Sequence, residues 1–411
     1  MPQNVALSHD LEQRLRASRT GRQWEILGTH RRAGVATPLF GIFSESSCGI
    51  GELPDLKILV DWCRETGISI IQLLPLNDVG FNFRPYDAQS MFALDPMYLA
   101  PGRLRGVEAR RWKERIDALK ESFPCAGPRV DYRIKGAKLA LFYDIFRTSC
   151  PQPSPELNAF IADNAYWLED YALFRAIKED RHEADWREWP AGLRDRAHED
   201  LASFSRERAA TLLFQKWLQW QLYEQFRDAK AYAGGHGVAL MGDLPFLVSR
   251  DSADVWAHQG YFKLDLVSGA PPDLLYAQGQ RWGMPPYDWP AIAGHGYDYI
   301  VEKLRYAENF YDLYRIDHVV GMFRLWTIRV EEPEATGGLN GVFDPSDEKT
   351  WEGHGRTLLD VLIDNTRMLA CAEDLGTIPP CTFRVLEEYG IPGIDVQRWT
   401  RDWGKTYAFK D

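Results

Sequence analysis

The first candidate for chemistry is an arginine–aspartate pair in the segment YRIDHVVGMFRLW. Its first part, Tyr314–Val320, is rich in β-branched and aromatic residues, which predicts a buried strand. Because strand side chains alternate between faces, Arg315 and Asp317 should share one face, and Ile316 and His318 the other. The guanidinium is expected to lower the pKa of Asp317 and keep it ionised, as a nucleophile requires. A structural buried ion pair has the same pattern, so both interpretations remain open here.

Two further carboxylates stand at the ends of predicted strands. Val238–Asp243 is an apolar run that ends in Asp243, and Leu369–Gly376 (LACAEDLG) carries Glu373 next to Asp374. Adjacent strand residues point to opposite faces, so only one of these two acids can face the arginine–aspartate pair. We interpret Glu373 as a general acid/base. Asp374 is then expected to support the strand end or a neighbouring arginine.

Two loops carry side chains suited to a polyhydroxyl ligand. Asn77–Asp87 follows an apolar strand and carries Tyr86, which could stack on a sugar ring or simply pack the loop. Val255–Trp289 is long and rich in Gly, Pro and aromatic residues, and it offers Gln280 and Trp282. A loop of this length inside a compact domain is usually functional.

The elements around these residues predict an α/β barrel with a helical insertion. A helix over Leu53–Thr66, a turn at Gly67 and a buried strand over Ser69–Leu76 follow the order of a parallel barrel. The six strands that we predict begin at Ser69, about Ala93, Val238, Tyr314, Leu369 and Gly393. We divide the chain into a leader (1–25), the first part of the barrel (26–100), a helical insertion (101–235) and the remainder of the barrel (236–411). Helices are predicted in the insertion over Leu168–Lys178 and Ala210–Ala231.

Composition excludes several classes of function. The chain has 411 residues and a formal net charge of −11, which argues against nucleic acid as a partner. No apolar run approaches the roughly 20 residues that span a bilayer, and the polar N-terminus resembles neither a signal nor a transit peptide. Six cysteines lack metal-ligand spacing, which indicates a reduced, cytoplasmic protein without a zinc site. The absence of a Gly-rich phosphate motif disfavours a barrel enzyme acting on phosphorylated metabolites.

Several long motifs resemble one family in order and spacing. They are RRAGVATPLFGIF with GIGEL and QLLPLNDVGFNFRPYDAQS, then GDLPFLVSRDSADVW, PPDLLYAQGQRWGMPPYDW, and RIDHVVGMFRLW with AEDLGTIPP. From about Arg31 to Trp403 the chain is similar to 4-α-glucanotransferases of the amylomaltase type, relatives of the α-amylase superfamily. The resemblance implies a (β/α)8 TIM barrel that moves α-1,4-glucan segments between malto-oligosaccharides. The retaining double displacement that it implies requires no metal or organic cofactor.

The resemblance also implies roles for individual residues. Asp317 corresponds to the nucleophile, with Arg315 as its partner, and Glu373 to the general acid/base. The substrate-binding residues that we assign around them are Tyr86, Asp243, Gln280, Trp282, Arg315, His318 and Asp374.

One departure from the family pattern concerns a third catalytic aspartate. The superfamily carries it in a His-Asp pair on the seventh strand, which would follow Trp399–Trp403, and this sequence ends at Asp411 before reaching it. We therefore expect strands seven and eight to be missing from the chain, which would leave an open sheet with two edges. A glucan hydrolase with the same carboxylates, or an inactive glucan-binding chain, are the alternatives to a transferase.

Overall fold

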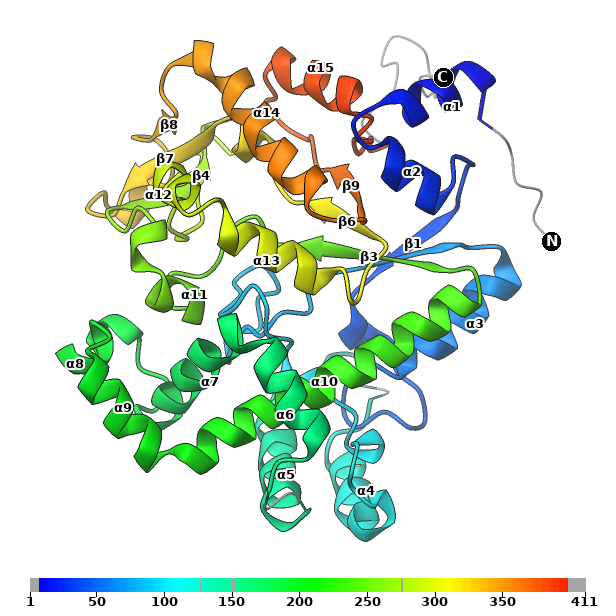
Figure 1. The fold of residues 1–411 in the computed structure, drawn as a ribbon, viewed down its shortest axis with the longest axis vertical. Coiled ribbons are helices and arrows are strands. Elements are labelled where there is room, and N and C mark those ends of the chain that lie inside the picture. Colours follow the sequence, from blue (N-terminus) through cyan, green and yellow to red (C-terminus); the bar gives the residue numbers. More distant parts are fainter. Residues whose placement is uncertain (1–6, 126, 150–151, 275, 398–411) are drawn as a thin grey trace.

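The centre of the molecule is a parallel sheet of five strands in the order β1-β2-β3-β6-β9 (Figure 1). The computed structural model describes residues 7–125, 127–149, 152–274 and 276–397. The strands of this sheet are Gly34–Thr37 (β1), Ile70–Leu73 (β2), Ala239–Leu244 (β3), Leu313–Ile316 (β6) and Leu369–Ala372 (β9). Their order in the sheet follows their order in the chain, as in a (β/α)8 barrel. Within the described residues the sheet is open, with β1 and β9 at its edges.

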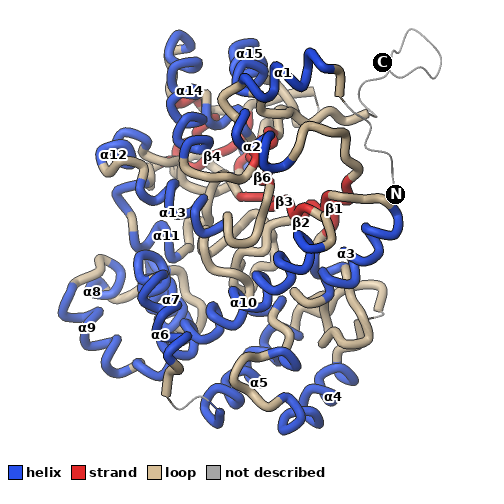
Figure 2. Tube along the Cα trace, turned by 45° about the vertical axis from the view of Figure 1, so that its right-hand side comes forward, coloured by secondary structure: helices blue, strands red, loops and turns tan. Residues whose placement is uncertain are grey.

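Helices alternate with these strands and enclose the sheet (Figure 2). The helices of this part are α1 (His9–Ala17), α2 (Gly21–Leu27), α3 (Asp55–Thr66), α11 (Ala253–Ala257), α12 (Trp289–Gly294), α13 (Asp298–Ala307), α14 (Glu348–Asp364) and α15 (Pro380–Tyr389). In α3, Leu56, Val60 and Cys63 recur at helical spacing and are all buried. Gly67 ends this helix in the left-handed region, at φ 80°, where glycine carries no steric penalty.

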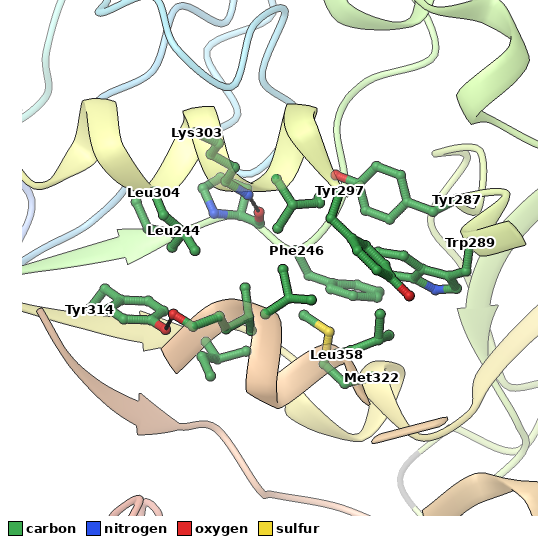
Figure 3. Close-up of a pocket in the computed structure, with 15 residues that line it drawn as sticks. Leu244, Phe246, Tyr287, Trp289, Tyr297, Lys303, Leu304, Tyr314, Met322 and Leu358 are labelled. Carbon is green, nitrogen blue, oxygen red and sulfur yellow. Dashed lines mark hydrogen bonds between the residues drawn. The ribbon is translucent and has the colours of Figure 1, made fainter. Parts of the chain in front are cut away.

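Strand β6 separates an apolar side of the sheet from a polar one. Tyr314 and Ile316 line a small apolar cavity of about 40 Å³ beneath α13 and α14, together with Leu244 and Leu358 (Figure 3). Arg315 lies between Tyr314 and Ile316 in the strand and therefore points to the opposite side. The helices thus cover the apolar side, and the polar side is left for chemistry.

Two of our strand predictions need correction, and one strand was missed. The strand predicted near Ala93 is wrong: Leu94 forms only an isolated bridge with Asn77, and its backbone is held instead by a side chain of the insertion. Residues 393–397 form no strand, and the end of the predicted strand at Trp399 lies outside the described residues. β1, which forms an edge of the sheet, was not predicted because its four residues, GVAT, lack an apolar run.

The insertion is helical, as the spacing predicted. Its helices are α4 (Lys113–Ser122), α5 (Ile134–Ser149), α6 (Pro155–Asp163), α7 (Ala165–Asp180), α8 (Ala191–Arg194), α9 (His198–Glu207) and α10 (Ala209–Gly235). Three buried glutamines of α10 dock the chain that runs from β2 into the insertion. The side-chain amides of Gln219, Gln221 and Gln225 each make two hydrogen bonds of 2.8–3.0 Å to the backbone N–H and C=O of one residue. The residues held in this way are Leu94, Arg105 and Ala100, respectively.

A second, antiparallel sheet corrects our view of Val255–Trp289 as a loop. Its order is β5-β4-β7-β8, and its strands are Leu266–Ala270 (β4), Gln280–Arg281 (β5), Leu325–Arg329 (β7) and Val342–Asp344 (β8). Glycine allows the pairing of β4 with β5, because a Cβ on Gly269 would lie 2.0 Å from the carbonyl oxygen of Gln280. The segment is therefore anchored at both ends of its turn.

A buried ion pair at the base of the insertion predicts a large effect on stability. The Nζ of Lys138 lies 2.6 Å from Oε1 of Glu52, and the two side chains are 0% and 4% exposed. Burial raises the pKa of Glu52 to about 7 despite the lysine. Lys138→Met leaves that carboxylate unpaired, and we expect it to lower the free energy of unfolding by about 3–5 kcal/mol. Urea unfolding measures this loss.

The loss should be larger at pH 8 than at pH 6. Lys138 lowers the pKa of Glu52, so removing it raises the folded-state pKa further above the unfolded value. The stability of the variant then keeps falling with rising pH over a range in which that of the wild type has levelled off. The double variant Lys138→Met/Glu52→Gln is the control and should recover most of the loss. A single variant as stable as the wild type at pH 8 would contradict the prediction.

Candidate active site

Arg315 joins two carboxylates on the polar side of the sheet. Its Nη1 donates to Oδ1 of Asp317 at 2.6 Å and to Oδ1 of Asp243 at 2.8 Å. Arg315 and Asp317 therefore share a face, as the alternation predicted. The strand, however, ends at Ile316, and His318 adopts a left-handed φ of 49°. This turn brings His318 to the same side as Asp317, so its predicted opposite orientation is wrong.

Glu373 follows the last residue of β9 and is held against that turn. Its Oε2 accepts a hydrogen bond from the backbone N–H of His318 at 2.9 Å, and its Oε1 accepts one from Leu375 at 3.2 Å. Its own N–H donates to the carbonyl of Ile316 at 3.0 Å. The ends of β6 and β9 are thus hydrogen-bonded together, which places Glu373 beside Asp317.

Asp374 holds the backbone of the frame around the site. Its Oδ1 accepts a hydrogen bond from the N–H of Ile394 at 2.9 Å. Gly393 allows this contact, because a Cβ there would lie 2.3 Å from Oδ2 of Asp374. The geometry is that of the strand-end support that we considered for Asp374. A direct contact between Asp374 and substrate stays a prediction.

Asp243 lies beneath the site and connects it to Tyr86. Asp243 is 2% exposed, and its Oδ2 accepts a hydrogen bond of 2.6 Å from the hydroxyl of Tyr86. Its other oxygen accepts the bond from Arg315. Tyr86 therefore has a polar contact in addition to any stacking surface that it offers. The chain of contacts runs from Tyr86 through Asp243 and Arg315 to Asp317.

Burial controls the electrostatics of the two central carboxylates. It raises the pKa of Asp317, although Arg315 opposes the shift. Our expectation of a lowered pKa is therefore wrong, because burial cannot be read from the spacing of an arginine and an aspartate. Burial also raises the pKa of Glu373; Arg315 opposes that shift and the charge of Asp317 adds to it. Because both pKa values are raised, the direction of the shift does not distinguish the two acids. Their hydrogen-bond partners do.

Two adjoining cavities surround these groups. The larger has a volume of about 560 Å³ and the smaller about 300 Å³, and Trp282, His318 and Glu373 border both. The larger is lined by Arg84, Pro85, Tyr86, Asp87, Pro245, Phe246, Leu247, Trp282, Met284, Arg315, Asp317, His318 and Glu373. The boundary between the cavities is thus made by the acid and two rings.

The second sheet positions the residues at this boundary. Gln280 lies on β5, and the indole N–H of Trp282 donates to its Oε1 at 3.0 Å. The ring of Trp282 meets that of His318 edge to face, with centroids 4.9 Å apart. Gln280 lines only the smaller cavity. The structure thus brings seven of the site residues predicted from the sequence together at these cavities. They are Tyr86, Gln280, Trp282, Arg315, Asp317, His318 and Glu373.

Sequence reasoning missed several lining residues. Arg84 and Asp87 lie near Tyr86 in its loop, and Phe246 follows strand β3, which ends at Leu244. All three stand in motifs that we had marked for other residues. The signal that could have found them is that each follows the end of a predicted strand. Trp326 and Phe343 line the smaller cavity from β7 and β8. Trp326 ends the segment YRIDHVVGMFRLW that we had marked, although we assigned it no role. No signal pointed to Phe343, because the second sheet was not predicted.

Comparison with known proteins decides the family. The model of the 4-alpha-glucanotransferase family matches residues 37–411. The chain belongs to the 4-alpha-glucanotransferase family. A 4-alpha-glucanotransferase of Chlamydia pneumoniae is 36% identical over 397 residues, which are 95% of this chain and 73% of that protein. A 4-alpha-glucanotransferase of Thermus thermophilus is 33% identical, over 88% of this chain and 71% of that protein.

Solved structures show the same fold as this 4-alpha-glucanotransferase family member. An amylomaltase from Streptococcus agalactiae, solved with acarbose, superimposes with a TM-score of 0.76 at 24% identity, over 90% of this chain and 74% of that chain. An amylomaltase from Corynebacterium glutamicum gives a TM-score of 0.75 at 22% identity, over 98% of this chain and 54% of that one. The α/β barrel fold expected from the motifs is confirmed by these neighbours.

Two other features of the family member concern metals and membranes. In the part of the chain that the structure describes, no group of three or more His, Cys, Asp or Glu residues could hold a metal ion. In the same part, no helix has the length and apolar character needed to cross a bilayer.

His318 predicts a pH dependence of stability. Burial, together with Arg315 and Arg324, lowers its pKa to about 4. The unfolded histidine titrates near 6.5, so the unfolded chain binds more protons between these values and stability falls as pH drops through this window. Between pH 4 and pH 6.5, we expect His318→Gln to reduce the pH slope of the unfolding free energy by up to the equivalent of about one bound proton.

Urea unfolding between pH 4.5 and pH 7 measures this slope. The matched control is His198→Gln, which removes an exposed histidine on α9 and should leave the slope as in the wild type. An unchanged slope in His318→Gln would contradict the prediction.

Proposed function

We propose that this chain transfers α-1,4-linked glucan segments between malto-oligosaccharides by a retaining double displacement. Membership of the 4-alpha-glucanotransferase family makes the chain a glycosyltransferase that acts on α-1,4-glucans. The observation that carries the mechanism is the meeting of Asp317 and Glu373 at one cavity, with Arg315 bound to Asp317. Paired carboxylates cleave glycosidic bonds, and in retaining enzymes one acts as the nucleophile and the other as the general acid/base.

In the first step Asp317 attacks the anomeric carbon of the donor. Its Oδ1 is occupied by Arg315, which leaves Oδ2 as the attacking atom. Glu373 gives its proton to the departing glycosidic oxygen, and the C–O bond to the leaving chain breaks as the bond to Asp317 forms. Its raised pKa favours the protonated form that this step needs.

In the second step Glu373 acts as a base. Forming the ester removes the negative charge of Asp317, which is one cause of the raised pKa of Glu373. The pKa of Glu373 should then fall, so that it can take the proton from the 4-hydroxyl of an incoming acceptor. The acceptor oxygen attacks the anomeric carbon, Asp317 leaves, and the anomeric configuration is retained.

The two cavities favour a sugar over water as the acceptor. They adjoin at Glu373, so a donor segment and an acceptor can each contact this acid from its own side. Trp282, Trp326 and Phe343 give the smaller cavity aromatic faces that suit sugar rings and displace water. Occupation of this space by an acceptor directs the second step to transfer.

Product analysis with maltotriose tests the function. Glucose together with chains longer than three units establishes transfer. Maltose and glucose alone would show the hydrolase alternative. Unchanged maltotriose, with binding of the oligosaccharide detected by calorimetry, would show a glucan-binding chain without turnover.

A further inference from the structure

A buried cluster of charges lies where the insertion meets the loop that carries Tyr86. Lys135 of α5 is 2% exposed, and its Nζ lies 2.8 Å from Oδ1 of Asp78 and 2.8 Å from Oδ2 of Asp95. The same Nζ donates to the carbonyl oxygen of Gly80 at 2.5 Å. Both aspartates are fully buried. One lysine thus holds three points of the chain that follows β2.

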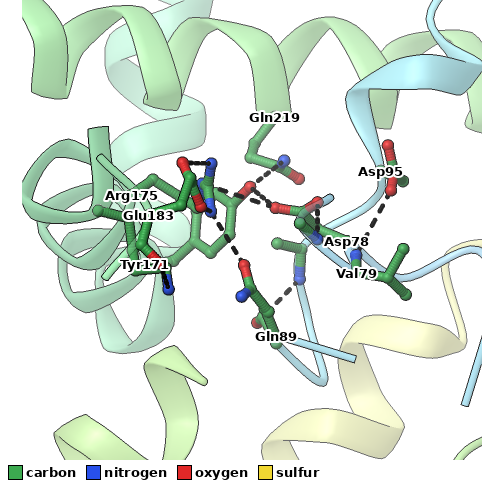
Figure 4. Close-up of polar contacts among 12 residues, drawn as sticks. Asp78, Val79, Gln89, Asp95, Tyr171, Arg175, Glu183 and Gln219 are labelled. Atoms are coloured by element: carbon green, nitrogen blue, oxygen red, sulfur yellow. Dashed lines mark hydrogen bonds and ion pairs between the residues drawn. The ribbon is translucent and has the colours of Figure 1, made fainter. Parts of the chain in front are cut away.

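Helix α7 holds the same chain from another side (Figure 4). The hydroxyl of Tyr171 donates to Oδ2 of Asp78 at 2.8 Å. Nη1 of Arg175 donates to Oε1 of Gln89 at 2.9 Å, and the guanidinium also pairs with Glu183, through Nη2 at 3.0 Å and Nη1 at 3.2 Å. Two helices of the insertion, α5 and α7, therefore bind this segment, and their contacts include Asp78 and Gln89.

These contacts close the neck of a loop whose tip lies in the active site. A Cβ on Gly80 would lie 2.6 Å from Oε1 of Gln89, so the two ends of the loop touch. Between them, residues 84–87 line the larger cavity. The tip meets the barrel through the 2.6 Å bond from Tyr86 to Asp243.

Stability alone is a poor explanation for this cluster. Burying paired charges costs desolvation, and apolar residues of similar volume hold a junction at least as firmly. Charged groups fix distances and directions that apolar packing leaves free. The cluster is thus suited to set the geometry of the loop.

We propose that Lys135, Arg175 and Gln89 are positioning residues for glucan transfer. By fixing the neck of the loop they hold the Tyr86 hydroxyl on Asp243, which in turn fixes Arg315 against the nucleophile. This inference rests on the function proposed above. It assigns a catalytic consequence to contacts that lie outside both cavities.

Gln89→Met is the variant that tests it. Methionine keeps the length of the side chain and removes the acceptor of Arg175, which retains its pair with Glu183. Lys135→Met, in contrast, would leave the buried carboxylate of Asp95 without its ion-pair partner and risks the fold. The matched control is Gln225→Met, because Gln225 is 6% exposed against 7% for Gln89, and its two hydrogen bonds hold Ala100, outside the loop.

Each variant is made in the wild type and in Tyr86→Phe, and kcat, KM for maltotriose and the unfolding temperature are measured. We expect Gln89→Met to lower kcat by about 10-fold, within the roughly 100-fold that a misplacement of 1 Å can cost. In Tyr86→Phe the same change should lower kcat less than 2-fold, since coupled residues are not additive. Gln225→Met should lower the unfolding temperature and leave kcat within 2-fold.

Three results would overturn the inference. The first is an unchanged kcat in Gln89→Met. The second is a loss of kcat from Gln89→Met that is as large in the Tyr86→Phe background as in the wild type. The third is a loss of kcat in Gln225→Met as large as that in Gln89→Met. The dissociation constant of maltoheptaose, measured by calorimetry for the same variants, compares them without turnover. A wild-type chain that neither transfers nor binds would overturn the proposed function, and the inference with it; transfer without coupling overturns the inference alone.

Discussion

Replacing Asp317 by asparagine is expected to abolish transfer while malto-oligosaccharides still bind. The amide keeps the shape of the side chain and an oxygen for Arg315, but it cannot form the glycosyl ester. By comparison with the removal of other enzyme nucleophiles, the loss in kcat should be on the order of 10⁴–10⁶-fold. The rate of glucose release from maltotriose measures it, and calorimetry with maltoheptaose checks that binding survives.

Asp312→Asn is the control at the other end of the same strand. Asp312 accepts a hydrogen bond from the N–H of Leu240 at 2.9 Å and pairs with Lys230, and neither cavity of the site includes it. This variant should keep most of its turnover. Near-normal turnover in Asp317→Asn would exclude Asp317 as the nucleophile.

Glu373→Gln is expected to lower transfer from maltotriose by about 10²–10⁴-fold, the usual contribution of a general acid/base. The effect should depend on the leaving group, because a departing fluoride needs no proton and a departing sugar does. With an α-maltosyl fluoride donor the first step should therefore approach the wild-type rate. The comparison of the two donors separates proton donation from a general disturbance of the site.

The pH profile gives a second test of this assignment. A general acid works in its protonated form, so the wild-type rate should fall as pH rises through the pKa of Glu373, which burial places above its ordinary value. The glutamine variant should lose this alkaline limb. An unaltered profile, or equal losses with both donors, would show that Glu373 has another role.

The parallel sheet could be predicted where a strand is apolar and buried on both faces. β3 and β9 have this character, and each carries its acid at the strand end, so the positions of Asp243 and Glu373 followed. The strand near Ala93 failed because its burial comes from contacts with the insertion, and hydrophobicity alone does not name the partner. The two-residue strand β5 is too short to show a period.

The site itself was predictable in composition more than in geometry. Arginine and aspartate two residues apart predict a shared face, and they do share one. The left-handed turn at His318 could not be foreseen, since a histidine rarely adopts that backbone region. The direction of the Asp317 shift also failed, because the degree of burial depends on residues far apart in the chain.

The three glutamines of α10 have a consequence for the substitutions that their partner residues allow. They bind the backbone of Leu94, Ala100 and Arg105 and not the side chains, so the identity of these residues is free of the docking contact. Substitutions there leave the docking hydrogen bonds intact, and packing is what constrains the buried Leu94 and Ala100. Proline is the exception, because it lacks the N–H that each glutamine oxygen accepts.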